Sequence, residues 1–123
     1  MATFLDFGGD GLSNGGRPAL NSAEFNVREI SKQFLLLEDH LSDDEKFCVD
    51  CIRKHLMMSE ALAEEAVAMD PDVKWLNDCK LVAFKTRDWM ARFSDGADKR
   101  VLAQEIRILR KGLVAKVFDP RVT

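Results

Sequence analysis

Four successive segments of the sequence carry apolar residues at alternating steps of three and four, and this periodicity is the strongest constraint on the fold. The clearest segment contains Val27, Ile30, Phe34, Leu37 and Leu41, a spacing that puts all five side chains on one face of an α-helix. No segment alternates apolar and polar residues as a half-buried strand would. The sequence therefore predicts an all-α fold of four amphipathic helices.

Capping signals and helix breakers set the boundaries of these helices. Asn21 with Glu24 has the spacing of a capping box, and Ser42 with Glu45 repeats it, so the second helix is expected to start directly after the first. The remaining breaks contain proline or glycine, which interrupt helices, and they lie at residues 70–72 and 94–96. Connections this short make successive helices antiparallel, which predicts an up-down four-helix bundle.

Residues 1–21 differ in composition from the rest of the chain and are expected to form an extended N-terminal arm. Five of the seven glycines lie there, and glycine disfavours the interior of both helices and strands. The arm also contains Phe4, Leu5, Phe7 and Leu12, which a wholly solvated tail does not need. We expect these side chains to dock on their own domain or on a neighbouring molecule; the alternative is a disordered leader. The bundle is expected over 22–118, followed by a tail at 119–123.

The size and composition of the chain predict a single soluble domain. It has 123 residues, of which 46% are hydrophobic and 32% charged, and this profile is typical of globular proteins. No stretch approaches the ~18 uninterrupted apolar residues of a membrane-spanning helix, and the N-terminus lacks the basic-then-apolar order of a signal peptide. Three cysteines are too few for a disulfide scaffold. We therefore expect a cytoplasmic protein without a membrane partner.

Charge is distributed unevenly along the chain. Residues 38–72 carry a net charge of −8, whereas residues 73–123 carry +6. Such polarity either steers a partner or is neutralised between neighbouring helices, and we favour neutralisation. The fourth helical segment has a basic side without interleaved aromatic residues, so nucleic acid is not an expected partner. Its basic residues are Arg100, Arg107, Arg110 and Lys111.

One cluster in the second helical segment has residue types that can carry chemistry. Cys48, Cys51 and His55 are expected on the inward face of this helix, since they fall in line with apolar residues at Met58, Leu62, Ala66 and Met69. At a rise of about 1.5 Å per residue, positions 48 and 55 are about 10 Å apart, so one ion cannot easily bind all three side chains on an intact helix. His40 lies just before the hairpin turn and adds a second imidazole. Cys79 is expected about 16 Å along the bundle from Cys51 and is excluded as a ligand.

Three interpretations of this cluster remain open. A structural zinc site would use His40, Cys48, Cys51 and His55 and would join the first two helices, because thiolates and imidazoles are ligands of zinc. Alternatively, the cysteines and His55 are ordinary buried residues, since free cysteine is among the most buried residue types. The third possibility is a small thiol–disulfide oxidoreductase using Cys48 and Cys51, although that motif ordinarily follows a strand. Phosphate-binding glycine loops and Glu-x-x-His pairs are missing, so a non-enzymatic protein is expected.

Residues 25–70 resemble a group of small helical proteins encoded by phages and large DNA viruses. The resemblance rests on FNVREI at 25–30, LLEDHL at 36–41, CxxCxxKH at 48–55 and EALAEEA at 60–66. It implies a viral setting, in which a compact helical domain with a glycine-rich arm suits a minor virion or assembly component. We therefore expect a structural protein that acts through protein–protein contacts, in the cytoplasm or in a virion.

Overall fold

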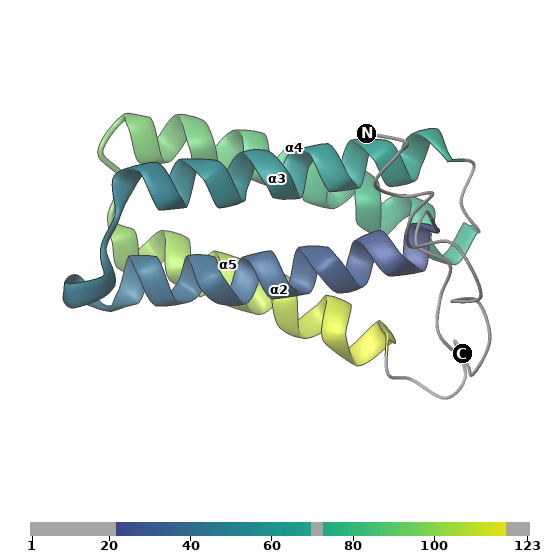
Figure 1. Ribbon diagram of the computed structural model, residues 1–123, viewed down its shortest axis with the longest axis horizontal. Helices are drawn as coiled ribbons and strands as arrows, with labels where there is room; N and C mark the ends of the chain where they lie inside the picture. Colours follow the sequence, from purple (N-terminus) through teal and green to yellow (C-terminus); the bar gives the residue numbers. More distant parts are fainter. Residues whose placement is uncertain (1–21, 70–72, 118–123) are drawn as a thin grey trace, which may run out of the picture.

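A computed structural model describes residues 22–69 and 73–117. Within these ranges the chain forms four α-helices and one 3-10 turn, without any strand, which confirms the predicted all-α four-helix bundle (Figure 1). None of the helices in the described ranges has the length and apolar character needed to cross a bilayer. The elements are α2 (Ala23–Ser42), η1 (Asp44–Lys46), α3 (Val49–Ala68), α4 (Val73–Ser94) and α5 (Lys99–Val117).

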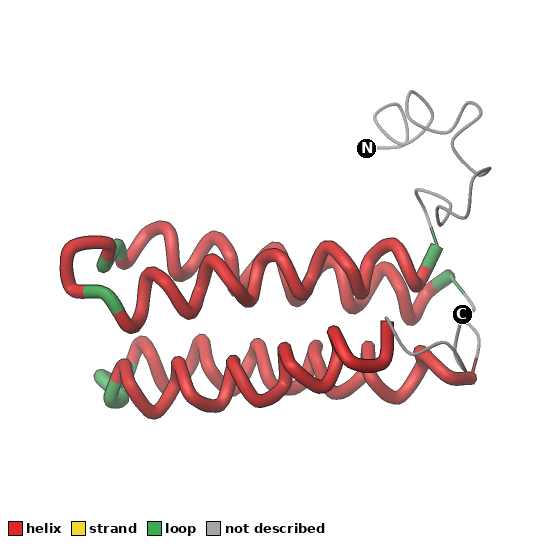
Figure 2. Tube along the Cα trace, turned by 90° about the horizontal axis from the view of Figure 1, so that it is seen from below, coloured by secondary structure: helices red, strands yellow, loops and turns green. Residues whose placement is uncertain are grey.

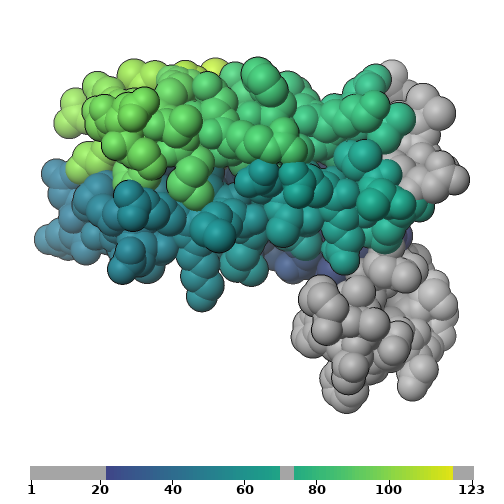
Figure 3. Space-filling model, turned by 90° about the horizontal axis from the view of Figure 1, so that it is seen from above, coloured from purple at the N-terminus to yellow at the C-terminus, as the bar shows by residue number. Residues whose placement is uncertain are grey.

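The four helices lie along the long axis of the molecule, each antiparallel to the one before it (Figures 1 and 2). α2 packs closely along both α3 and α5, and α3 packs along α4; α3 and α4 together cover the face shown in Figure 3. α4 and α5 approach each other closely at few positions. The α2–α3 and α4–α5 connections lie together at one end, which we call the hairpin end, and α2 begins at the opposite end, which we call the arm end.

A continuous apolar core runs through the bundle. Its centre is the fully buried pair Phe34 and Trp89, whose rings meet edge to face with centroids 5.5 Å apart. The predicted stripe of α2 is buried in full. The apolar stripe of α5 is buried except for the half-buried Leu109; its residues are Leu102, Ile106, Leu109, Leu113 and Val117. Other large apolar side chains enclosed in this core include Ile30, Leu37, Ile52, Leu56, Leu102, Ile106 and Leu113.

The predicted inward face of α3 is wrong by about one residue position. Of the predicted line only Ala66 is buried; Cys48, Cys51, His55, Leu62 and Met69 are half-buried and Met58 is exposed. The reason is packing, because small side chains in the buried stripe let α3 approach α2 and α4 closely and leave the larger side chains on its flank. The residues of the buried stripe are Ile52, Leu56, Ser59, Ala63 and Ala66.

α3 also begins later than the sequence predicts. The side chain of Asp43, rather than Ser42, accepts the N–H of Glu45 at 2.9 Å and starts the short 3-10 turn. The helix itself starts at Val49 with Cys48 as its N-cap. The connection between α2 and α3 is therefore a turn of several residues, and Cys48 lies outside the helix.

The predicted turn at 94–96 is confirmed. Gly96 has a φ of +86°, a left-handed conformation that glycine adopts without strain. The carbonyl of Arg92, in the last turn of α4, accepts the N–H of Ala97 at 2.9 Å and the N–H of Asp95 at 3.2 Å, which satisfies it at the helix end. α5 starts two residues later at Lys99.

Polar side chains bridge α4 and α5, two helices whose backbones come close to each other at few positions. Glu105 accepts the indole N–H of Trp89 at 3.1 Å and two hydrogen bonds from Arg92, both at 2.8 Å. Hydrogen bonds from Arg92 and Trp89 lower the pKa of Glu105 to about 2 despite its partial desolvation. Lys116 pairs with Asp78 farther along the same seam.

Candidate functional site

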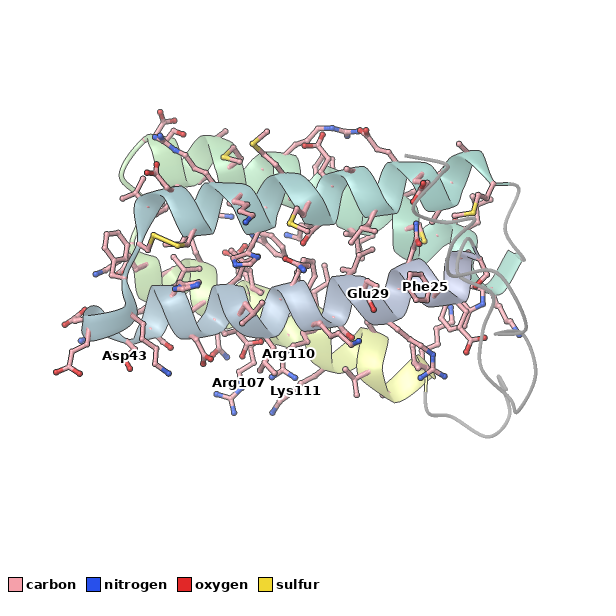
Figure 4. All side chains as sticks on the ribbon, viewed as in Figure 1. Phe25, Glu29, Asp43, Arg107, Arg110 and Lys111 are labelled. Atoms are coloured by element: carbon pink, nitrogen blue, oxygen red, sulfur yellow. A yellow bond between two sulfur atoms is a disulfide. The ribbon has the colours of Figure 1, made fainter. Side chains whose placement is uncertain are left out.

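The predicted cysteine–histidine cluster lies at the hairpin end, where α2 stops and α3 starts. Cys48 has an extended backbone, with φ −147° and ψ 109°, and its sulfur accepts the N–H of Cys51 at 3.2 Å. Cys48 and Cys51 form a disulfide, seen as a yellow bond in Figure 4, and their Cα atoms are 5.2 Å apart. Cys48 is the N-cap of α3, and its carbonyl accepts the N–H of Ile52 at 2.9 Å. The first turn of α3 is therefore closed, and the two sulfurs lie together at the start of the helix.

The two histidines of the chain stack on each other across the α2–α3 interface. The ring centroids of His40 and His55 are 5.6 Å apart, and their planes differ by 17°. Each ring is held by a second contact: Nδ1 of His40 lies 2.8 Å from the carbonyl oxygen of Lys46, and Nδ1 of His55 contacts Oε1 of Gln33. The stacked imidazoles thus connect the last turn of α2, the 3-10 turn and the second turn of α3.

These contacts define which nitrogen of each imidazole carries the proton. A carbonyl or amide oxygen only accepts hydrogen bonds, so Nδ1 of His40 and of His55 is the donor. Nε2 then keeps its lone pair in the neutral ring. Burial lowers the pKa of His55, and the neighbouring His40 and Lys54 lower it further, so the neutral form is favoured in this position.

The structure thus brings the four predicted site residues to one end of the bundle, in two pairs. Cys48 and Cys51 are bonded to each other, and His40 and His55 are stacked. Within residues 22–69 and 73–117, no group of three or more His, Cys, Asp and Glu side chains has the arrangement of a metal site. Chemically, the cluster offers a reversible disulfide beside two imidazoles with free lone pairs.

Cys79, which the sequence excluded from the cluster, is a free and fully buried thiol in α4. Burial raises its pKa to about 11, so it carries little thiolate at neutral pH.

Gln33 is the residue of the site that sequence reasoning missed. It lies seven residues before His40 and therefore on the same face of α2, which is the only signal for its role.

A shallow apolar groove runs along the outer edge of α3 on the side of α2. It has a volume of about 360 Å³ and is lined by Met58, Ala61, Leu62 and Glu65. Met58 is 40% exposed. The groove is fixed to α2 by Asn26, whose buried amide donates to the carbonyl of Leu62 at 2.9 Å and to Glu65 at 3.0 Å. We call this surface the α3 groove.

The α2 face beside the α3 groove also carries apolar side chains. Phe25, Glu29 and Leu36 share one side of α2, since they are four and seven residues apart, and Figure 4 shows Phe25 and Glu29 on the face turned to the viewer. Leu36 is 43% exposed.

α2 starts at the arm end with Ser22 as its N-cap, which accepts the N–H of Phe25 at 3.0 Å. Asn21 and the predicted partner-binding residues Phe4, Leu5, Phe7 and Leu12 lie outside the described residues.

The opposite charges of the two halves pair within one molecule, as we expected. Arg87 of α4 binds Glu60 and Glu64 of α3, and Arg110 of α5 binds Glu38 of α2. Lys99 of α5 likewise contacts Asp44 of the 3-10 turn and lies over the ring of Phe47. Of the predicted basic side, Arg107 and Lys111 extend from α5 into solvent beside Arg110 (Figure 4).

The chain matches no protein-family model, no curated protein and no solved structure.

Proposed function

We propose that the protein is a non-enzymatic assembly protein, in which the N-terminal arm of one copy binds the α3 groove of a neighbouring copy. The observation that carries this proposal is the groove itself. Its lining is apolar except for Glu65, and an apolar groove beside a helix can accept apolar side chains of a partner. The arm supplies the apolar residues that such a groove accepts.

The position and length of the arm support this occupant. The groove lies toward the arm end, because Leu62 and Glu65 are bound by Asn26 in the first turns of α2. The 21 residues that precede Ser22 span up to about 70 Å when extended, whereas a helix of 20 residues is about 30 Å long. A fully extended arm of this length is long enough to extend past its own bundle to a neighbour. Phe4, Leu5, Phe7 and Leu12 are the side chains proposed to enter the groove.

The resemblance of residues 25–70 to small phage and viral proteins is the reason for placing this assembly in a virion, as a minor component. A short bundle that offers a groove and an arm can link identical copies head to tail, since the two surfaces are different and need not close into a dimer. Neutralisation of charge within each molecule leaves the apolar contact as the main attraction between copies.

Sedimentation velocity over a range of concentrations tests the proposal. The full chain is expected to associate, and deletion of residues 1–20 is expected to give a folded monomer. Met58→Asp is expected to weaken association at least about tenfold, because losing a buried anchor costs more than about 1.4 kcal/mol. Met57→Asp is the matched control, since Met57 adjoins Met58 in sequence and is 62% exposed but does not line the groove.

Two results would contradict this function. One is association that is unchanged by deletion of the arm. The other is equal loss of association in the Met57 and Met58 variants, which would show that any added charge on α3 has the same effect. Far-UV circular dichroism of each variant shows whether the bundle is retained.

A second candidate function is thiol–disulfide exchange, and the observation that favours it is the Cys48–Cys51 disulfide at the start of α3. The N-terminus of a helix stabilises a thiolate, so the pair has one feature of a redox-active site. This function predicts that catalytic amounts of the protein speed the reduction of a model disulfide by a dithiol, and that Cys51→Ser abolishes the effect. A rate equal to that of the dithiol alone would eliminate it.

A further inference from the structure

Assembly through the arm and the α3 groove does not explain how the two imidazoles at the hairpin end are oriented. His40 and His55 each use Nδ1 to donate to an oxygen, on Lys46 and Gln33 respectively, and each keeps the Nε2 lone pair available. Metal-binding histidines have this arrangement as a rule, because the hydrogen bond at one ring nitrogen fixes the tautomer and the direction of the other. Stacking of the rings serves no evident purpose in the core, since both residues are only half-buried.

The sulfur atoms of the neighbouring pair complete a set of four donors. Cys51 and His55 are one helical turn apart on the same face of α3, a rise of about 6 Å. Cys48 lies outside the helix and is already turned back to Cys51. His40 of α2 lies against His55, with the two ring centroids 5.6 Å apart. Each of the four side chains is thus next to another member of the set: Cys48 to Cys51, Cys51 to His55, and His55 to His40. In the disulfide state neither sulfur is a thiolate.

We propose that reduction of the Cys48–Cys51 disulfide converts the hairpin end into a zinc site formed by His40, Cys48, Cys51 and His55, and that oxidation of the two thiols releases the zinc. Two thiolates with two imidazoles form one of the tetrahedral sets that hold structural zinc. This inference is independent of assembly through the arm, which uses the α3 groove and not the hairpin end.

Electrons and protons balance in this switch, and the oxidation state of the zinc does not change. A dithiol attacks one sulfur of the disulfide, the S–S bond breaks, and a second exchange leaves two cysteine thiols and an oxidised reductant, a transfer of two electrons and two protons. Zn²⁺ then displaces the two thiol protons and binds two sulfurs and two Nε2 atoms. A small-molecule disulfide reverses the reaction by accepting the two electrons, and Zn²⁺ leaves unchanged because it has no redox chemistry.

Zinc would replace the disulfide as the link at this end of the bundle. The disulfide connects only the N-cap and first turn of α3, whereas the metal would also bind α2 through His40. The hydrogen bond of His40 to Lys46 would tie the 3-10 turn to the same centre. We therefore expect the zinc-bound form to be more resistant to unfolding than the reduced, metal-free form.

The test uses the full chain in two redox states without any substitution. The protein is reduced with a phosphine, and the phosphine is removed under argon. The reduced protein is then incubated with Zn²⁺ and passed through gel filtration, and its zinc and protein contents are measured. Oxidised protein is treated identically. The expected result is one zinc per chain in the reduced state and none in the oxidised state. Co²⁺ in place of Zn²⁺ is expected to give the visible absorption of a tetrahedral, thiolate-bound ion only after reduction.

Single substitutions identify the ligands. Cys51→Ser and His40→Asn are each expected to weaken zinc binding by at least about tenfold, whereas Cys79→Ala, which removes the buried thiol outside the cluster, is expected to retain it. Equal zinc content in the oxidised and reduced states would overturn the proposal, as would a reduced wild-type chain that binds no zinc. Retention of full affinity in the reduced His40 variant would overturn the assignment of the histidine ligand.

Discussion

Glu105 offers the sharpest test of how α4 and α5 are held together. Its carboxylate accepts the indole N–H of the buried Trp89 and two hydrogen bonds from Arg92. Glu105→Gln keeps the size of the side chain and one oxygen for Trp89, but it removes the negative charge that binds Arg92. The variant therefore isolates the contribution of the ion pair from that of packing.

The magnitude follows from the pKa of this carboxyl group. Lowering it from the ordinary 4.5 to about 2 corresponds to at most about 3 kcal/mol of folding free energy. The side chains of Glu105 and Arg92 are 30% and 34% exposed, and solvent screens such pairs, so we expect about 1–2 kcal/mol. For a domain of this size, a loss of 1 kcal/mol lowers Tm by about 4–8 °C.

The dependence on pH has a definite sign. Because the pKa of Glu105 is lower in the folded state, its contribution is fully present above about pH 4.5 and is lost as the pH falls toward 2. Urea unfolding at several pH values between 7 and 2 is the assay. The variant is expected to be less stable than the wild type at pH 7, and the difference is expected to shrink as the medium becomes acidic.

A matched control separates this effect from the loss of any surface carboxylate. Glu29 has a similar exposed fraction, 29%, but pairs only with the exposed Lys32 on its own helix, so Glu29→Gln is expected to cost less than about 0.5 kcal/mol. The reasoning would be refuted if the difference in unfolding free energy between the wild type and Glu105→Gln stayed constant from pH 7 to pH 2. Equal losses in the two variants would refute it as well.

Three further outcomes are expected from the described contacts. Asn26→Ala removes a buried amide that donates two hydrogen bonds to α3, and thermal unfolding should show a loss of about 1–3 kcal/mol; a loss below 0.5 kcal/mol would contradict this. Arg110→Met breaks the half-buried pair with Glu38 and should destabilise the bundle in urea, whereas Arg107→Met at the exposed neighbouring position should not. Cys79, with its pKa raised to about 11, should resist alkylation at pH 8 until the protein unfolds, and rapid labelling of the native protein would disprove its burial.

Much of the bundle was predictable because periodicity and helix breakers agree. The stripes of α2 and α5 combine large apolar side chains with regular spacing, so their buried faces follow from the sequence. α3 misled the same reasoning because its buried stripe contains Ser59, Ala63 and Ala66, while the more apolar Met58 and Leu62 lie on its flank. Apolar character alone does not reveal where close packing selects small residues.

The beginning of α3 shows a second limit of sequence patterns. Ser42 with Glu45 has capping-box spacing, yet Asp43 caps a 3-10 turn there and the helix starts at Val49. Cysteine is not among the usual N-cap residues, so nothing in the sequence indicates the role of Cys48. The proximity of His40 to the cluster was predictable from the hairpin. The hydrogen bonds that His40 and His55 donate to Lys46 and Gln33, which fix the tautomers, depend on side-chain packing.

The central claim, that the arm of one copy lies in the α3 groove of another, is tested most directly by cross-linking between labelled chains. Phe7 is replaced by a photoreactive amino acid, ¹⁵N-labelled and unlabelled proteins are mixed, and the cross-linked peptides are identified by mass spectrometry after illumination. We predict cross-links from position 7 to the α3 peptide that contains Met58 and Leu62, with mixed light–heavy pairs. Cross-links confined to single chains, or directed to another surface, would contradict the account.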